Sequence, residues 1–132
     1  MKQVLIALVL LFATPPLLWA DQIIDTRGLP YDGVVKNYRD FTVFLQVGGT
    51  GELIKKKLWQ IRRMEIAGNG AFNQAEQLLE KKKFTEAIVS YDKAHRAART
   101  KAAWIKTMIR DRRYGALVAA GKIKRAVEDW LE

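Results

Sequence analysis

The chain has 132 residues, a formal net charge of +9 and no cysteine. The absence of cysteine excludes disulfides, structural thiolate zinc, a thiol nucleophile and a lipid-bearing cysteine, so stability must come from a hydrophobic core. A positive excess of this size attracts acidic proteins, anionic lipids, acidic polysaccharide or nucleic acid.

The first twenty residues have the pattern of a secretory signal peptide. Lys2 gives a positive start, residues 4–13 form an unbroken apolar run, and Pro15 and Pro16 break it. We expect cleavage after Ala20 and export to the periplasm or the cell exterior, with membrane contact only transient and through this segment. The alternative is an uncleaved anchor, although residues 4–20 fall short of the roughly 20 apolar residues that span a bilayer.

Residues 21–67 predict a small all-β unit of five short strands separated by hairpin-length loops. The β runs lie at 22–26, 31–38, 41–47, 52–57 and 62–66. A helical turn is expected at 58–61, and the glycine-rich residues 48–51 predict a tight turn. Curling into a closed barrel would bury the apolar face and remove both open edges, so we expect a small five-stranded β-barrel.

A family resemblance agrees with this interpretation. Gly28, Tyr31, Gly33 and Val35, followed by FTVFLQVGGTGELIKKKLWQIRRMEI, resemble the small barrels of the Sm-like and Src-homology type in secreted bacterial proteins of unknown function. The resemblance covers about a third of the chain. Members of these families bind peptides, RNA or one another, so the resemblance implies a barrel and no single activity.

The run Ala67-Gly68-Asn69-Gly70 is a clear linker, and residues 71–132 have the composition of a helical unit. Helices are expected at 71–82, 85–99, 101–119 and 123–131. Thr85 is the expected N-cap of the second helix, and Gly121 is expected to end the third. The chain is therefore predicted to be α+β.

In the segment KKFTEAIVSYDKA, aromatic and small residues alternate at steps of three, four and three, which places them on one helical stripe. The segment GKIKRAVEDW repeats the beginning of that order. Both resemble tetratricopeptide-type repeats, in which small residues let two helices approach closely. The resemblance implies packing roles for Ala75, Leu78, Phe84, Ala87, Tyr91, Ala94, Gly121, Ala126 and Trp130.

The match to this repeat is incomplete. Lys82 stands where the repeat usually has a turn glycine, and the two copies are 39 residues apart (126 − 87) rather than about 34. Two copies are also fewer than the three or so repeats that usually stand alone. We therefore expect the helices to lean on the barrel or on a partner.

No catalytic, cofactor or metal motif is present. His95 is the only histidine, which leaves no second imidazole and no thiol for a metal site, and we expect it to be an ordinary exposed helical residue. Residues 48–51 are followed by no helix, which disfavours a phosphate-binding loop. The carboxylate pairs Asp25 with Asp32 and Glu76 with Glu80 are interpreted as turn caps or salt bridges. We expect no cofactor and no enzymatic activity.

Basic residues occur in short clusters that either bind anions or form solvated faces. The candidates for anion binding are Lys55, Lys56, Lys57, Arg62, Arg63, Lys81, Lys82, Lys83, Arg110, Arg112 and Arg113.

The favoured hypothesis is a non-catalytic, exported interaction or scaffold module that binds a protein or peptide partner. The alternative is a basic protein of the envelope surface that binds anionic lipid, polysaccharide or nucleic acid through charge, with nucleic acid the least favoured because of export.

Overall fold

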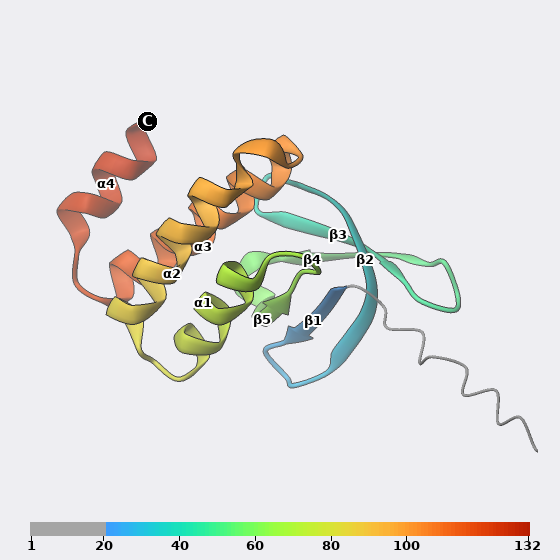
Figure 1. Ribbon diagram of the computed structural model, residues 1–132. Coiled ribbons are helices and arrows are strands. Elements are labelled where there is room, and N and C mark those ends of the chain that lie inside the picture. Colours follow the sequence, from blue (N-terminus) through green and yellow to red (C-terminus); the bar gives the residue numbers. More distant parts are fainter. Residues whose placement is uncertain (1–20) are drawn as a thin grey trace, which may run out of the picture.

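The computed structural model describes residues 21–132, and the expected signal peptide lies outside this range. The strands are β1 (Asp21–Asp25), β2 (Pro30–Arg39), β3 (Thr42–Val47), β4 (Leu53–Lys57) and β5 (Ile61–Glu65), with the 3-10 turn η1 (Leu58–Gln60) before β5. The helices are α1 (Gly70–Glu80), α2 (Phe84–Ala97), α3 (Ala103–Ala119) and α4 (Ile123–Leu131), with the 3-10 turn η2 (Ala98–Thr100) before α3. The predicted α+β class and the predicted strands and helices are confirmed, with ends that differ by two residues at most. Figure 1 shows the helices beside the sheet, with α4 outermost.

The sheet is antiparallel, with the strand order β4-β3-β2-β1-β5. The prediction of a closed barrel is wrong, because β4 pairs only with β3 and β5 pairs only with β1. The open sheet is nevertheless strongly curled. Lys56 Nζ on β4 lies 3.4 Å from Asp25 Oδ2 on β1 and donates a hydrogen bond of 3.1 Å to the Tyr31 hydroxyl on β2.

Two local features bend β2. A β-bulge between Val35 and Asn37 shifts its register with β3. Gly33 lies so close to β3 that a Cβ atom there would be 2.0 Å from the carbonyl oxygen of Gln46. A side chain at this position would therefore push the two strands apart, which explains a glycine in the middle of a strand.

The outer edge of β5 is covered by side chains from the helices rather than by β4. The Met64 N–H donates to Glu76 Oε2 over 2.9 Å, and Arg112 donates to the carbonyl oxygens of Ile61 and Arg62. Just beyond the strand, Asn73 exchanges two hydrogen bonds with the backbone of Ile66. These contacts satisfy the edge that a barrel would close with another strand, which is why the sheet can stay open.

The hydrophobic core is continuous between sheet and helices. Ile23, Val43, Leu45 and Met64 contribute from the strands. The helical contribution to the same core consists of Phe72, Ala75, Ala87, Ile88, Tyr91, Ala94, Met108, Ile109, Ala116, Leu117 and Ala126. The apolar face of the sheet is therefore buried by α1 and α3, which provide the cover that was expected from barrel closure.

The connections α1–α2 and α3–α4 use the same turn. Lys82 and Gly121 have φ angles of 58° and 74°, and each N–H donates to the carbonyl three residues earlier. The next N–H in each turn donates five residues back, which completes a Schellman motif. Gly121 thus ends α3 as predicted. The predicted N-cap at Thr85 is wrong, because α2 already begins at Phe84 and no side chain caps it.

Within residues 21–132, no helix combines the length and the apolar character that crossing a membrane requires.

Candidate peptide-binding groove

An apolar groove lies where the tip of the β2–β3 hairpin meets η1, the end of α1 and the middle of α3. Its volume is about 370 Å³. The groove is lined by Phe41, Leu58, Trp59, Leu79, Asp111, Arg112, Tyr114 and Gly115. We call it the aromatic groove. Trp59 is 68% exposed at its rim, an unusual exposure for a large apolar side chain.

Phe41 reaches the groove from a strained turn. The hairpin joins Arg39 to Thr42 through two residues, Asp40 and Phe41, whose φ angles of 50° and 57° correspond to a type I′ turn. The second position of such a turn favours glycine, and a left-handed backbone costs a residue with a Cβ about 1–2 kcal/mol. A phenylalanine held in this conformation indicates a role for its side chain.

Trp130 of α4 extends the same aromatic surface. Its ring stacks on Phe41 at a centroid distance of 5.7 Å and contacts Tyr114 at 5.3 Å. Arg110 Cζ lies 5.7 Å from the centre of the Trp130 ring. Trp130 and Phe41 remain 46% and 38% exposed, so both present ring surface to solvent beside the groove.

Buried polar contacts fix the floor of the groove. Arg112 makes a bidentate contact with Glu76 at 2.7 and 2.6 Å, and the Tyr91 hydroxyl donates to Glu76 over 2.6 Å. The Tyr38 hydroxyl donates to Asp111 Oδ2 over 2.6 Å. These bonds join β2, α1, α2 and α3, so the groove is built on elements that cannot move independently.

The ionisation of these groups follows from burial and their partners. Burial lowers the pKa of Arg112, but the negative charge of Glu76 raises it by more. The pKa of Arg112 therefore lies above its ordinary value. Burial and then Glu76 raise the pKa of Tyr91. Burial and the hydrogen bond to Asp111 raise the pKa of Tyr38. Arg112 is therefore charged and both tyrosines are neutral at physiological pH.

The charged side chains that line the groove already have partners, because Asp111 accepts from Tyr38 and Arg110 while Arg112 is bonded to Glu76. What the surface offers a ligand is mainly aromatic and aliphatic. Such a site suits an apolar side chain of a partner, which would be held by burial of its surface.

The residues expected to pack in the repeats lie mostly between helices. Ala75, Ala87, Tyr91, Ala94 and Ala126 are buried, and Leu78 and Phe84 are half-buried. Gly121 forms the α3–α4 turn. Trp130 differs from the others, because it contacts Phe41 of the β2–β3 hairpin and Tyr114.

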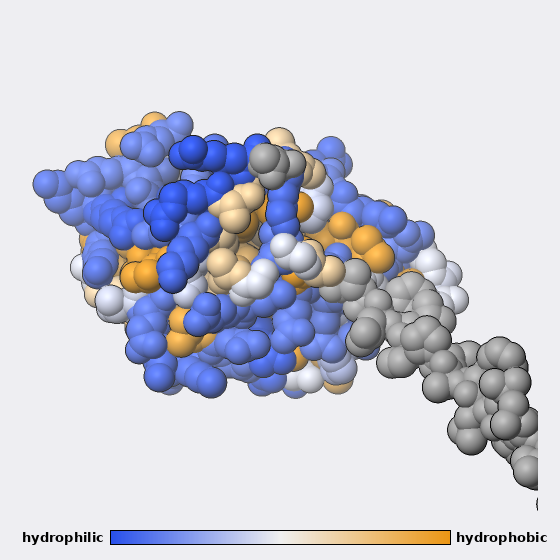
Figure 2. All heavy atoms as spheres, viewed as in Figure 1, coloured by the Kyte–Doolittle hydropathy of each residue, from blue (hydrophilic) through white to orange (hydrophobic). Residues whose placement is uncertain are grey.

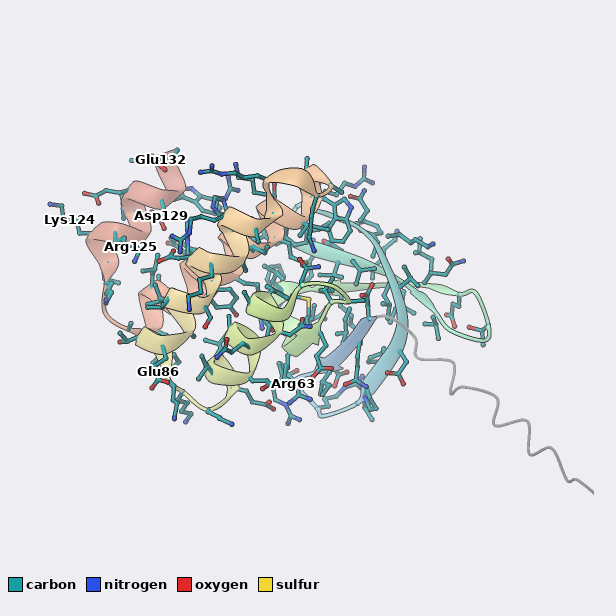
Figure 3. The ribbon with its side chains drawn as sticks, in the orientation of Figure 1. Arg63, Glu86, Lys124, Arg125, Asp129 and Glu132 are labelled. Atoms are coloured by element: carbon teal, nitrogen blue, oxygen red, sulfur yellow. The ribbon has the colours of Figure 1, made fainter. Side chains whose placement is uncertain are left out.

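The predicted anion-binding residues do not form one surface. Most of them contact carboxylates: Lys56 meets Asp25, Arg62 and Arg63 meet Glu80, Arg110 meets Asp111, Arg112 meets Glu76, and Arg113 meets Asp92 and Asp129. Lys81, Lys82 and Lys83 are exposed at the α1–α2 turn, whereas Lys55 and Lys57 lie on β4. In Figure 3, the labelled Arg63 and Asp129 lie at opposite sides of the molecule, on the sheet side and on α4. Figure 2, in the same view, shows hydrophilic residues over most of the face toward the viewer.

The remaining titratable residues considered in the sequence have structural positions. Asp25 is buried and accepts hydrogen bonds from the backbone N–H groups of Arg27 and Leu29. Burial raises the pKa of Asp25, but these bonds and the Arg27 side chain lower it by more, so the net shift is downward. Asp25 is thus the expected turn cap. Among the described residues, no group of three or more His, Asp or Glu side chains is placed to hold a metal ion.

The sequence analysis did not single out Phe41 or Trp59 as binding residues. Phe41 fitted the alternation of a strand, and Trp59 fitted a connecting turn. One available signal was a bulky residue within a hairpin turn of two residues. In comparisons with known proteins, no family model, no curated protein and no solved structure matches this chain.

Proposed function

We propose that the chain is a non-catalytic interaction module whose aromatic groove holds a hydrophobic side chain from a segment of a partner protein. The observation that carries this proposal is the exposure of Phe41, Trp59 and Trp130 around an apolar hollow on a well-braced floor. Exposed aromatic side chains beside a pre-formed hollow are typical of residues that dominate binding energy.

The strain at Phe41 supports a binding role. A glycine at this position would remove the unfavourable left-handed backbone of a residue with a Cβ, but would also remove the ring from the groove. The stack on Trp130 returns about 0.5–1.5 kcal/mol beyond the burial of the ring, so packing in the folded state offsets part of the cost of this backbone. The ring nevertheless remains 38% exposed, so it also presents a surface that a ligand can cover.

The setting of the module is also a proposal. The helical half resembles tetratricopeptide-type repeats and has the same turn at Lys82 and at Gly121. This resemblance suits a scaffold for protein partners. With cleavage after Ala20 and export, the partner would be a periplasmic or extracellular protein.

A peptide selection tests the proposal directly. Residues 21–132 are immobilised and used to select binders from a library of random displayed peptides, and the affinities of the enriched peptides are measured by calorimetry. We expect the binders to share an aromatic or large aliphatic residue. Trp59→Ala should weaken their binding about tenfold or more, which is the behaviour of an interface anchor.

Two further variants make the result specific. Phe41→Gly should also weaken binding while leaving the protein folded, because relief of the left-handed backbone offsets part of the lost packing on Trp130. Val89→Ala removes an exposed apolar side chain of α2 that does not line the groove, and it should bind like the wild type. Binders that tolerate Trp59→Ala and Phe41→Gly, or a complete lack of binders, would contradict the proposal.

The alternative function, attraction of anionic surfaces by charge, makes a different prediction. Binding through exposed charges weakens steeply with ionic strength, whereas burial of an aromatic anchor does not. Measuring the same binders at low and high sodium chloride therefore separates the two functions: affinity that disappears at high salt supports the alternative, whereas binders with an aromatic or aliphatic anchor should keep most of their affinity.

A further inference from the structure

A second hollow, which we call the basic pocket, lies beside the aromatic groove. Its volume is about 340 Å³. It is lined by Arg39, Asp40, Thr42, Phe44, Lys55, Lys57 and Gln60. Phe41 lies between Asp40 and Thr42 in the sequence, and residues 58–59 lie between residues 57 and 60, but these three residues line the aromatic groove instead. A single ridge, made of residues 40–42 and 57–60, therefore separates the two hollows.

The cations of the basic pocket are held in place without carboxylate partners. Arg39 Cζ and Lys55 Nζ lie 5.5 and 5.6 Å from the centre of the Phe44 ring. Lys57 Nζ donates to the carbonyl oxygen of Asp40 over 3.2 Å and lies 5.7 Å from the Trp59 ring. In the part of the chain that the structure describes, none of these three cations forms an ion pair.

The charge of the basic pocket selects for anions. Arg39, Lys55 and Lys57 contribute three positive charges and Asp40 one negative charge, which leaves +2 (3 − 1). Contacts with aromatic rings restrict the flexible cationic side chains, so part of the entropy lost on binding an anion has already been lost. The planar guanidinium of Arg39 also matches the geometry of a carboxylate.

We propose that the segment bound in the aromatic groove carries Asp or Glu residues beside its hydrophobic anchor, and that their carboxylates occupy the basic pocket. This inference rests on the proposed function and specifies the partner as an acidic segment. Each exposed carboxylate contact contributes about two- to fivefold in affinity, so two or three contacts together contribute about tenfold.

The ridge sets the spacing between anchor and acid. A single layer of chain with its side chains is about 10 Å thick, as the packing distance of sheets indicates. An extended segment advances about 3.3 Å per residue. A peptide that crosses the ridge therefore carries its acidic residue about three or four positions from its hydrophobic anchor.

An acidic protein segment fits the basic pocket better than single-stranded nucleic acid does. Nucleic acid binding of this kind depends on free aromatic faces on which bases stack. The Phe44 ring, which lines the basic pocket, is half-buried and already contacted by Arg39 and Lys55, so it offers a base little free surface. The exposed rings of Phe41 and Trp59 line the aromatic groove on the other side of the ridge.

Parallel selections test this inference. The random peptide library is selected on residues 21–132 of the wild type and on a triple variant, Arg39→Gln, Lys55→Gln and Lys57→Gln. Wild-type binders should be enriched in Asp or Glu about three or four residues from the hydrophobic anchor. Binders of the triple variant should keep the anchor and lose this acidic preference. Circular dichroism verifies that both proteins are folded.

A matched control removes the effect of overall charge. Arg96→Gln, Lys81→Gln and Lys93→Gln also lower the net charge by three, at exposed positions of the helical half outside both hollows. The best wild-type peptide should bind the first triple variant about tenfold more weakly and the control with little change. Replacing its acidic residues by Gln or Asn should cost the wild type the same factor and cost the first variant little.

The failures are distinguishable. Binders that share an anchor but show no acidic preference, or the same preference on both proteins, overturn this inference and leave the groove proposal standing. The absence of any shared anchor overturns the proposed function itself. Vesicles of phosphatidylcholine with phosphatidylglycerol and a single-stranded oligonucleotide serve as further probes. If either probe loses binding with the first triple variant while acidic peptides do not, the basic pocket serves that probe's class of ligand instead.

Discussion

At the scale of single residues, a strained left-handed backbone occurs both at the aromatic groove and at a turn away from it. Asp40, Phe41 and Lys82 are the residues other than glycine with positive φ in residues 21–132. Asp40 and Phe41 form a turn that presents a ring to the aromatic groove. Lys82 is exposed at the α1–α2 turn and does not line the aromatic groove. The strain at Lys82 is therefore expected to be removable without loss of binding.

We predict that Lys82→Gly stabilises the protein by about 1 kcal/mol. Glycine adopts the left-handed conformation without a clash with Cβ, and Gly121 shows that the equivalent turn uses it. Lys81→Gly is the matched control, because Lys81 has a φ of −78° and gains nothing from glycine. Urea denaturation of both variants measures the difference. Equal midpoints for the two variants would contradict the turn geometry.

His95 predicts a pH dependence of stability. Burial first, and then the positive charges of Arg113 and Lys106, lower its pKa below 6.5, although Asp92 and Asp129 oppose this shift. The folded state therefore binds a proton less readily than the unfolded state. The stability present above the unfolded pKa of about 6.5 is lost as the pH falls from there toward the folded pKa.

We expect the melting temperature to fall between about pH 7.5 and about pH 5.5 by more in the wild type than in His95→Gln. The difference between the two proteins isolates this histidine from the other titrating groups. Thermal melts in a series of buffers of equal ionic strength would measure it. Parallel curves for the two proteins would show that His95 is as free to accept a proton in the folded state as in the unfolded state.

At the scale of elements, the edge of β5 depends on a buried ion pair. Arg112 and Glu76 come from α3 and α1, and each also bonds to the backbone of β5. Removing one partner of such a pair leaves an uncompensated buried charge, which typically costs about 3–5 kcal/mol. We therefore expect Arg112→Met to destabilise the protein by about this amount.

Chemical denaturation of three variants tests the ion pair. Arg110→Met, on the same helix but partly exposed, should cost about 1 kcal/mol or less. The double variant Arg112→Met with Glu76→Gln should be more stable than Arg112→Met alone, because the unpaired charge is gone while Gln can still accept from the Met64 N–H. A double variant less stable than the single one would show that the uncompensated charge of Glu76 is not the cause.

The elements were predictable from the sequence because their signals are local. Alternation in residues 41–47, the glycines between strands and the helical period after Gly70 each lie within a short window. The open sheet was not predictable, because closure depends on what covers β5. Glu76 and Arg112 are 36 residues apart and carry the same charges as ordinary surface residues of a helix. The aromatic groove and the ring beside it likewise need Phe41, Trp59 and Trp130 to be brought together from distant parts of the sequence.

At the scale of the whole molecule, sheet and helices behave as one folding unit. The core is continuous, and the Tyr38 hydroxyl on β2 donates to Asp111 on α3 across the boundary that the linker at residues 67–70 indicates. Without the sheet, Phe72 and the Glu76–Arg112 pair would lose part of the cover that buries them. The helical residues would then expose an apolar face to solvent.

We therefore predict that residues 71–132 expressed alone are aggregated, oligomeric or poorly folded, whereas residues 21–132 are soluble and cooperative. Circular dichroism with thermal melting measures folding, and sizing chromatography measures association. Arg112→Met in residues 21–132 is a useful comparison, because it removes contacts between the helices and β5 while the sheet is still present. A monomeric helical fragment that melts cooperatively would contradict the prediction. It would mean that the contacts among α1, α2 and α3 suffice for folding, and that the bonds from Glu76 and Arg112 to β5 serve only to position the sheet and the aromatic groove.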